Sequence, residues 1–233
     1  MKNFREICYK NMKPGLLFRS DLLYHLNPKE KALLRDNNIK VVIDLRNKDE
    51  VEHLKDTNIK AIKFVNNPML PESKEGEDSP LKTVTIKHMT LPDMDNAYRE
   101  LVRRDRQSAW SNIFNILLAD NGGAVLYHCS AGKDRTGVVT AVILTALGID
   151  KDTIYQDYLL TNEKPLYYKK MALQMDPESR EIFLDYFQAK KEYLDASFDE
   201  INKIYGSFDK FLLECCLIDN NKLAIFKDKY LKQ

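Results

Sequence analysis

The stretch HCSAGKDRTG, residues 128–137, lies between two apolar runs that differ in length and character. The run before it, residues 124–127, is short and follows an Asn-Gly-Gly turn, which is typical of a buried strand. The run after it, residues 138–147, is apolar almost all round and is followed by Gly148, which is typical of a helix packed against a sheet. A strand, a glycine-containing turn and a helix in this order indicate an α/β fold.

The sequence on both sides continues this alternation. Residues 39–45 and 59–65 predict strands. Residues 28–35 and 96–119 predict helices. Residues 66–80 hold several loop-forming residues and predict a mobile insertion. The C-terminal third predicts helices whose apolar stripes pack in the core, formed by Leu194, Phe198, Ile201, Tyr205, Leu223, Phe226 and Tyr230.

The charges of the chain nearly cancel. Its 233 residues include 36 Lys and Arg against 35 Asp and Glu, a formal net charge of +1, so any phosphate affinity must be local, and nucleic acid is not an expected partner. The longest mostly apolar stretch, residues 138–149, is well short of the roughly 20 residues that span a bilayer. The first residues show no signal peptide, and the four cysteines are too few for a disulfide scaffold. We therefore expect a cytoplasmic protein without a transmembrane segment.

The segment 128–137 has the features of an anion site. Its cysteine, Cys129, and its arginine, Arg135, stand six positions apart. A turn between a strand and a helix directs several free backbone N–H groups at one point, where an anion can bind. The planar guanidinium of Arg135 adds donors that suit two phosphate oxygens.

A thiol at the mouth of such a site feels the same positive field, which favours the thiolate of Cys129 near neutral pH. Attack of this thiolate on a bound phosphate ester would give a phosphocysteine, which water must then hydrolyse. The chemistry requires no metal and no cofactor. Cys8, Cys215 and Cys216 have no His or Cys partners at metal-ligand spacing, so we interpret them as ordinary thiols.

The segment matches HCxxGxxRTG, the signature of the cysteine-dependent protein tyrosine phosphatase superfamily. Further stretches resemble its bacterial branch of tyrosine and dual-specificity phosphatases, namely GLLFRS at 15–20, DLR at 44–46, DYLLTN at 157–162 and YGSF at 205–208. The resemblance implies a central, mainly parallel sheet flanked by helices. It also implies one phosphatase domain over residues 1–233, with a catalytic core over about 1–150 and a helical part over about 151–233 that can cover the active site.

The resemblance also assigns roles to residues. Cys129 would be the nucleophile, Arg135 the phosphate clamp, and the hydroxyl of Thr136 a stabiliser of the leaving thiolate. We expect His128 to order the loop rather than to transfer protons. The residues expected to bind phosphate are Ser130, Ala131, Gly132, Lys133, Arg135 and Thr136.

The general acid has more than one candidate. The Trp-Pro-Asp signature of many tyrosine phosphatases is absent, and Leu91-Pro92-Asp93 is the nearest imitation. In the bacterial branch the proposed acid is the aspartate of the loop, here Asp134, which we favour over Asp93 and Asp95.

Asp44 and Arg46 follow a predicted parallel strand, at the edge where α/β sheets collect ligands. We expect them to support the phosphate loop, with Arg19 nearby, and a plain surface ion pair is the alternative. The strands that end near Arg46 and Cys129 should then be parallel neighbours.

The sequence indicates a phosphomonoester hydrolase that acts on phosphotyrosine in proteins. Dual specificity, with action on phosphoserine and phosphothreonine as well, is a second expectation. A phosphoinositide phosphatase is the alternative, because Lys133 would add a cation for a second phosphate. A non-catalytic phospho-ligand binding module would need a broken nucleophile or arginine, and both residues are intact. A sulfur-transfer or arsenate-reducing enzyme fits the Thr-Gly helix start less well.

Overall fold

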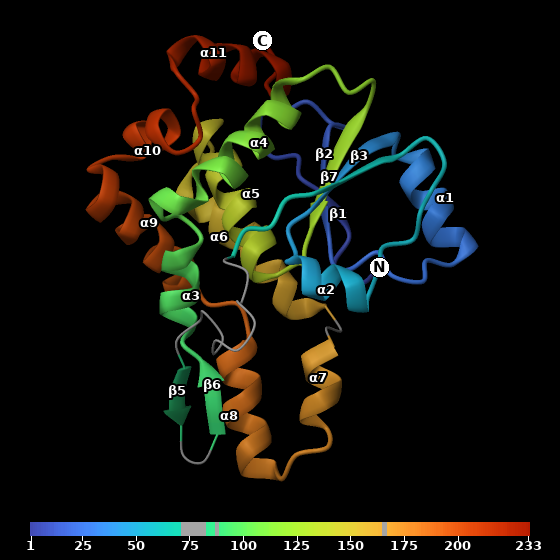
Figure 1. The fold of residues 1–233 in the computed structure, drawn as a ribbon, viewed down its shortest axis with the longest axis vertical. Helices are drawn as coiled ribbons and strands as arrows, with labels where there is room; N and C mark the ends of the chain where they lie inside the picture. Colours follow the sequence, from blue (N-terminus) through green and yellow to red (C-terminus); the bar gives the residue numbers. More distant parts are fainter. Residues whose placement is uncertain (71–82, 87–88, 165–166) are drawn as a thin grey trace.

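A five-stranded sheet forms the centre of the computed structural model, which describes residues 1–70, 83–86, 89–164 and 167–233 (Figure 1). Its strands in spatial order are β1 (Arg5–Glu6), β2 (Leu17–Ser20), β7 (Ala124–His128), β3 (Ile39–Asp44) and β4 (Lys63–Asn66). Only β1 runs antiparallel to its neighbour among these pairs. The expected α/β fold with a mainly parallel sheet is confirmed. Most of the predicted insertion at 66–80 lies outside the described residues.

The three central strands end side by side. Ser20 of β2 and Asp44 of β3 both pair in register with His128 of β7. This confirms that the strands preceding Arg46 and Cys129 are parallel neighbours. Because the carboxyl ends of parallel strands share one edge, the segments after these residues meet at the position where α/β folds bind ligands.

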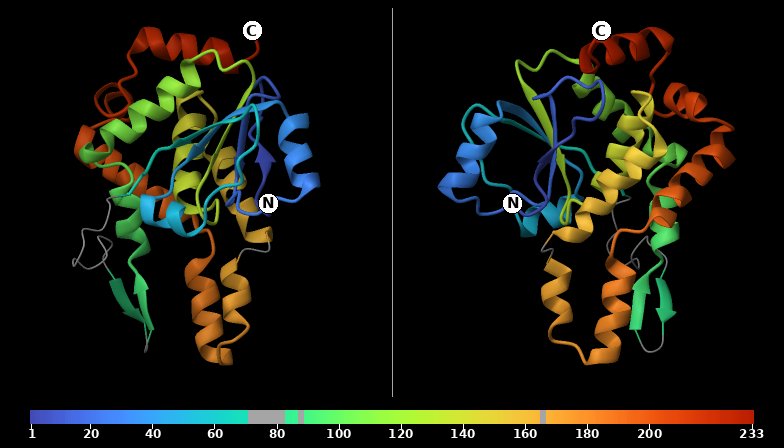
Figure 2. Two further views of the ribbon diagram at one scale, coloured as in Figure 1. Left: turned by 45° about the vertical axis from the view of Figure 1, so that its right-hand side comes forward. Right: turned by 180° about the vertical axis from the view of Figure 1, so that it is seen from behind.

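Side chains alternate between the two faces of the sheet. Val42 and Leu126 pack with Leu34 of α1 (Pro28–Asp36) on one face. Val41 and Tyr127 point into a larger core on the other face. Figure 2 shows α1 on one side of the sheet and the remaining large helices on the other. The helices of the larger core are α3 (Met94–Glu100), α4 (Gln107–Leu118), α5 (Asp134–Ala146), α6 (Lys151–Leu159), α9 (Lys191–Tyr205), α10 (Phe208–Glu214) and α11 (Asn220–Tyr230).

The helices predicted around the motif and at the C-terminus are present. Helix α5 follows the phosphate loop directly, is buried over most of its length, and is followed by Gly148 with φ of 77°. Asn27 caps α1 and Asp219 caps α11, each by accepting hydrogen bonds from backbone N–H groups of the first turn. The apolar stripe of α9 buries Leu194 and Ile201.

The single helix predicted over residues 96–119 is wrong. The chain forms α3 and α4, separated by a turn that contains the short 3₁₀ helix η1 (Arg104–Arg106). The backbone carbonyl of Leu101 accepts a hydrogen bond from Trp110 Nε1 at 2.8 Å, and that of Val102 accepts one from the Tyr205 hydroxyl at 3.0 Å. Side chains therefore satisfy carbonyls that a continuous helix would have paired.

The strand predicted at 59–65 begins later than expected. β4 starts at Lys63, after a turn in which Ala61 has φ of 70°, a conformation that no strand residue adopts. The short helix α2 (Lys48–His53) follows β3 and the Asp-Leu-Arg segment at residues 44–46.

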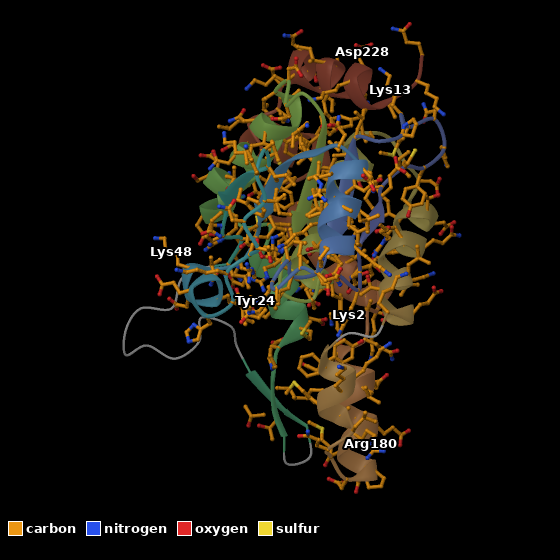
Figure 3. All side chains as sticks on the ribbon, turned by 90° about the vertical axis from the view of Figure 1, so that its right-hand side faces the viewer. Lys2, Lys13, Tyr24, Lys48, Arg180 and Asp228 are labelled. Carbon is orange, nitrogen blue, oxygen red and sulfur yellow. The ribbon has the colours of Figure 1, made fainter. Side chains whose placement is uncertain are left out.

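A second group of elements projects from the sheet and its helices (Figure 1). Strands β5 (Thr83–Ile86) and β6 (Met89–Pro92) form an antiparallel pair, and α7 (Tyr167–Ala172) and α8 (Pro177–Phe187) follow η2 (Leu160–Glu163). Leu91, Tyr168, Ala172 and Phe183 form their shared apolar cluster. Figure 3 labels Arg180 on this projection, away from the sheet. We refer to α7 and α8 below as the α7–α8 hairpin.

Candidate active site

The phosphate loop, residues 129–136, runs from the end of β7 into the first turn of α5. Cys129 is the first residue after β7, and only 2% of it is exposed. The hydroxyl of Thr136, in the first turn of α5, donates a hydrogen bond to Cys129 Sγ at 3.2 Å. The N-terminus of α5 therefore lies beside the sulfur, and the Thr136 hydroxyl is a hydrogen-bond donor to it.

Gly132 gives the loop its shape. Its φ of 64° lies in the left-handed region, and a Cβ at this position would lie 2.3 Å from the backbone oxygen of Ser20. Its own carbonyl accepts hydrogen bonds at 2.8 Å from Arg19 Nη2 and from the side-chain amide of Asn3. The loop is therefore pressed against the end of β2 and held from behind by two buried side chains.

Arg19 belongs to a buried network centred on Asp157 of α6. The carboxylate of Asp157 accepts hydrogen bonds from Arg19 at 2.5 Å, Arg5 at 2.9 Å and the Tyr9 hydroxyl at 2.8 Å. Burial alone would raise the pKa of Asp157, but the two guanidinium groups outweigh it and hold the pKa below its usual value. Asp157 lies in the segment 157–162 that resembles the bacterial branch, but no spacing in the sequence relates it to Gly132.

Glu50 of α2 contacts the arginine of the loop, and sequence reasoning missed it. Arg135 donates from Nη1 and Nη2 to the two carboxylate oxygens of Glu50, at 2.5 and 2.8 Å, and Ser130 Oγ donates to the same carboxylate at 2.6 Å. Burial opposes ionisation of Glu50, yet these donors lower its pKa to about 2. The pair fixes the plane of the guanidinium at the mouth of the loop.

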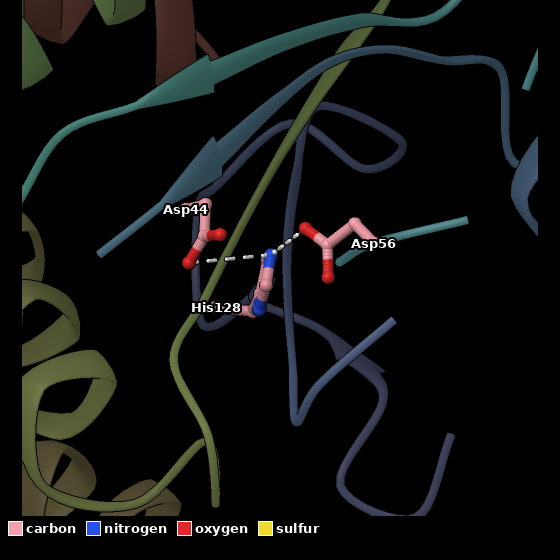
Figure 4. Close-up of side chains that lie close together, drawn as sticks. All are labelled: Asp44, Asp56 and His128. Carbon is pink, nitrogen blue, oxygen red and sulfur yellow. Dashed lines mark hydrogen bonds and ion pairs between the residues drawn. The ribbon is translucent and has the colours of Figure 1, made fainter. Parts of the chain in front are cut away.

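Asp44 and Arg46 lie behind the loop, buried rather than on the surface. Arg46 donates to both carboxylate oxygens of Asp44, at 2.8 and 2.7 Å, and to Asp56 at 2.9 Å. His128 Nε2 lies 2.8 Å from Asp56 (Figure 4). Its Nδ1 lies 3.2 Å from the Cys129 carbonyl. Burial lowers the pKa of His128, but the hydrogen bond and charge of Asp56 and the charge of Asp44 outweigh it, so the net shift is upward.

Three of these side chains could in principle hold a metal ion. The ligand atoms of Asp44, Asp56 and His128 lie within 4.8 Å of one another. Arg46, however, already binds both carboxylates, so their negative charge has a cationic partner within the protein. The arrangement is that of an ion-pair cluster which orders the end of β3 and the start of the loop.

Asp134 is the first residue of α5 and stands at the loop itself. Its Oδ1 accepts a hydrogen bond from the Tyr98 hydroxyl at 2.6 Å and lies 3.2 Å from the Lys133 ammonium. The rival candidates lie at the start of α3, where Asp93 accepts a hydrogen bond from the Asn96 N–H as the helix cap and Asp95 is exposed. This placement leaves Asp134 as the carboxyl group on the phosphate loop.

Lys133 is directed away from solvent. It is only 2% exposed, and its ammonium donates a hydrogen bond to the Phe187 carbonyl at the end of α8. The same ammonium lies 5.7 Å from the ring centre of Tyr168 and 5.8 Å from that of Phe187. The side chain thus connects the loop to the α7–α8 hairpin.

A cavity of about 810 Å³ opens beside Ser130 and Ala131 of the loop. Its lining also includes Tyr24 and Lys2, which Figure 3 labels, and Glu50. The walls combine apolar and charged side chains, which suits an organic group attached to a phosphate held in the loop.

A buried cysteine at the end of a strand, a hydroxyl donor on its sulfur and an arginine over the loop define a cysteine-dependent phosphatase. The chain belongs to the tyrosine phosphatase family, whose family model matches residues 1–232. It is 28% identical over 249 residues to the triple specificity protein phosphatase PtpB of Mycobacterium tuberculosis, covering 90% of each chain. It is 38% identical over 55 residues to a tyrosine-protein phosphatase of Nostoc commune, covering 24% of this chain and 19% of that protein.

Among solved structures, the chain is similar to TpbA of P. aeruginosa, with a TM-score of 0.34, 17% identity, and coverage of 84% of this chain and 96% of that one. Within the part of the chain that the structure describes, no helix is both long and apolar enough to cross a membrane.

Proposed function

We propose that this phosphatase hydrolyses phosphotyrosine in proteins through a phosphocysteine on Cys129. The Cys129 thiolate attacks phosphorus, the bond to the ester oxygen breaks, and Asp134 gives its proton to the departing oxygen. Water then attacks the phosphocysteine and passes a proton to Asp134. The phosphorus–sulfur bond breaks, and the thiolate returns to its hydrogen bond with Thr136.

In this mechanism the phosphate loop and Arg135 stabilise the transition state. We expect backbone N–H groups of residues 130–136 and the guanidinium to donate hydrogen bonds to the three equatorial oxygens. Glu50 holds that guanidinium through both terminal nitrogens, so the clamp is oriented before substrate arrives. The observation that carries the proposal is the contact of Thr136 with Cys129 at the N-terminus of α5.

The contacts of Lys133 argue against its role as the cation for a second phosphate. A second phosphate on an inositol ring needs a free cation, and the Lys133 ammonium is bound to the Phe187 carbonyl. Phosphoserine and phosphothreonine use the same chemistry and are included in the proposed substrate range. PtpB is named for triple specificity, which is compatible with this range.

We also propose that residues 1–233 act as one phosphatase domain, in which the helical part after residue 150 carries a cover for the site. The contact between Lys133 and the α7–α8 hairpin supports such a cover. The four cysteines are all free, which supports a reducing, cytoplasmic setting.

Initial rates test the proposed function. They are measured on phosphotyrosine, phosphoserine and phosphothreonine peptides and on phosphoinositides, for the wild type, Cys129→Ser and the control Cys8→Ser. We expect turnover to be fastest on phosphotyrosine, abolished in Cys129→Ser and unchanged in Cys8→Ser, whose thiol lies 3.6 Å from the Met12 carbonyl oxygen. An active Cys129→Ser variant whose rate falls with a metal chelator would refute the mechanism.

A further inference from the structure

Two buried tyrosines connect Asp134 to the interior of the protein. The hydroxyl of Tyr98, on α3, lies 2.6 Å from Asp134 Oδ1 and 2.5 Å from the hydroxyl of Tyr158, on α6. Both tyrosines are almost completely buried. Three elements distant in sequence thus meet through one chain of hydrogen bonds at the candidate general acid.

The direction of these hydrogen bonds follows from the ionised form of Asp134. A carboxylate can only accept, so Tyr98 donates its proton to Asp134. Tyr98 has one hydroxyl proton, and the short contact with Tyr158 must therefore use the Tyr158 proton. Burial, followed by the charge of Asp134, raises the pKa of both phenols, so both remain protonated donors at neutral pH.

Packing holds the two rings in place. A Cβ on Gly137 would lie 2.9 Å from two ring carbons of Tyr158, so the glycine of the motif leaves the space that this ring fills. The ring of Tyr193, on α9, lies 5.5 Å from that of Tyr98, centre to centre. The hydroxyl of Tyr98 is therefore confined to the position where it meets Asp134.

We propose that Tyr98 is a positioning residue for the general acid, and that Tyr158 fixes the Tyr98 hydroxyl. The inference rests on the proposed role of Asp134 in proton transfer. Tyr98 and Lys133 both contact Oδ1, which assigns the transferred proton to the other oxygen, Oδ2. When that proton leaves, the carboxylate formed is already hydrogen-bonded, so the contact strengthens as the reaction proceeds.

Among the residues that the structure describes, several ionisable groups lie around Asp134 and bear on the pH dependence of this site. Those that contact it or feel its charge are Tyr98, Lys133, Arg135, Tyr158, Tyr168 and Tyr193. In Tyr98→Phe the ionised carboxyl loses a donor while the other groups stay. Loss of the donor disfavours the carboxylate that forms when the proton leaves, so the alkaline limb of the kcat/KM profile moves upward.

The experiment compares Tyr98→Phe with the wild type on aryl phosphates with good and poor leaving groups. We expect a loss of about tenfold in kcat for the poor leaving group, a small part of the 10²–10⁴-fold that acid catalysis supplies, and less than about twofold for the good one. Tyr230→Phe is the matched control, since it removes another buried hydroxyl, which donates to the Leu117 carbonyl at 2.9 Å. It should leave the leaving-group dependence and the pH profile unchanged.

The same substitution in the Asp134→Asn background separates positioning from structure. Tyr98→Phe should add no further leaving-group dependence there, because the acid is already absent. Equal losses on both leaving groups, or the same loss in both backgrounds, would overturn the proposal. If Tyr98→Phe fails to fold, Tyr158→Phe replaces it in the test. We expect Tyr158→Phe to move the alkaline limb of the kcat/KM profile in the same direction by a smaller amount. An unchanged pH profile would overturn the proposal.

Two variants distinguish the role of Tyr98 from that of Asp134. If Asp134→Asn is selective for poor leaving groups and Tyr98→Phe is not, the positioning role is wrong and the proposed function stands. If Asp134→Asn itself spares poor leaving groups, the assignment of the acid is wrong and the role of Tyr98 falls with it.

Discussion

Replacing Asp157 by asparagine removes the negative charge at the centre of the network behind the phosphate loop. The side chain is 1% exposed and pairs with Arg19, which is fully buried, and with Arg5, whose side chain is 12% exposed. Removing one partner of a buried ion pair costs about 3–5 kcal/mol, because the remaining charge stays desolvated. In a chain of this size each kcal/mol lowers the melting temperature by about 2–4 °C, so we expect Asp157→Asn to melt roughly 6–20 °C lower at pH 7.

Thermal unfolding followed by circular dichroism measures this loss. The control is Asp195→Asn, which removes a carboxylate that pairs with Lys151 at the surface, where both side chains are more than a third exposed. Such exposed pairs contribute up to about 1 kcal/mol, so the control should melt within a few degrees of the wild type. A melting temperature for Asp157→Asn within about 2 °C of the wild type would show that the network does not stabilise the fold as argued.

The sign of the pH dependence follows from the lowered pKa of Asp157. A carboxyl group that is more acidic in the folded state stabilises the protein above its unfolded pKa. That contribution is lost as the pH falls from the ordinary value of 3.8 through the lower folded value. The difference between wild type and Asp157→Asn should therefore be largest near neutral pH and shrink in strong acid.

Two further substitutions test the shape and the clamp of the loop. Gly132→Ala would place a Cβ 2.3 Å from the Ser20 oxygen, so it should lower kcat/KM on a phosphotyrosine peptide by about 100-fold or more. The control is Gly122→Ala, which has a similar φ but no atom within 4 Å of the added Cβ, and it should leave kcat/KM within about twofold of the wild type. Equal losses in the two variants would contradict the tight fit of the loop. Glu50→Gln removes a carboxylate whose pKa is lowered from 4.5 to about 2. Since the side chain is 35% exposed, solvent screening limits its contribution to about 1 kcal/mol of unfolding free energy at pH 7. Urea unfolding of wild type and Glu50→Gln measures this difference, which should disappear as the pH falls from 4.5 towards 2. A difference that does not change with pH would exclude the ion pair as its cause.

The phosphate loop could be located from the sequence because its parts are local. Cys129, Gly132 and Arg135 stand within one turn between a strand and a helix, and that local pattern implies the anion site. Glu50, Asp56 and Asp157 come from three other segments, and their contacts with the loop or its supports depend on how helices pack around the sheet. No spacing in the sequence encodes such contacts.

The same limit applies to the fold. The strands and the helix that flank the loop were predictable from hydrophobic periodicity. The break between α3 and α4 was not, because it depends on Trp110 and Tyr205 reaching carbonyls of residues 101 and 102 from elsewhere in the chain. Lys133 illustrates the point in the site itself, since its sequence position suggested a phosphate ligand while its ammonium binds the Phe187 carbonyl.

Trapping the phosphocysteine tests the central claim most directly. The enzyme is mixed with a phosphotyrosine peptide, quenched in acid within the first turnover and analysed by mass spectrometry after proteolysis. We expect one added phosphoryl group on the peptide that contains Cys129, absent in Cys129→Ser and present in Cys8→Ser. Turnover of the substrate with no phosphoryl group on Cys129 at any quench time, or a phosphoryl group on another residue, would contradict it.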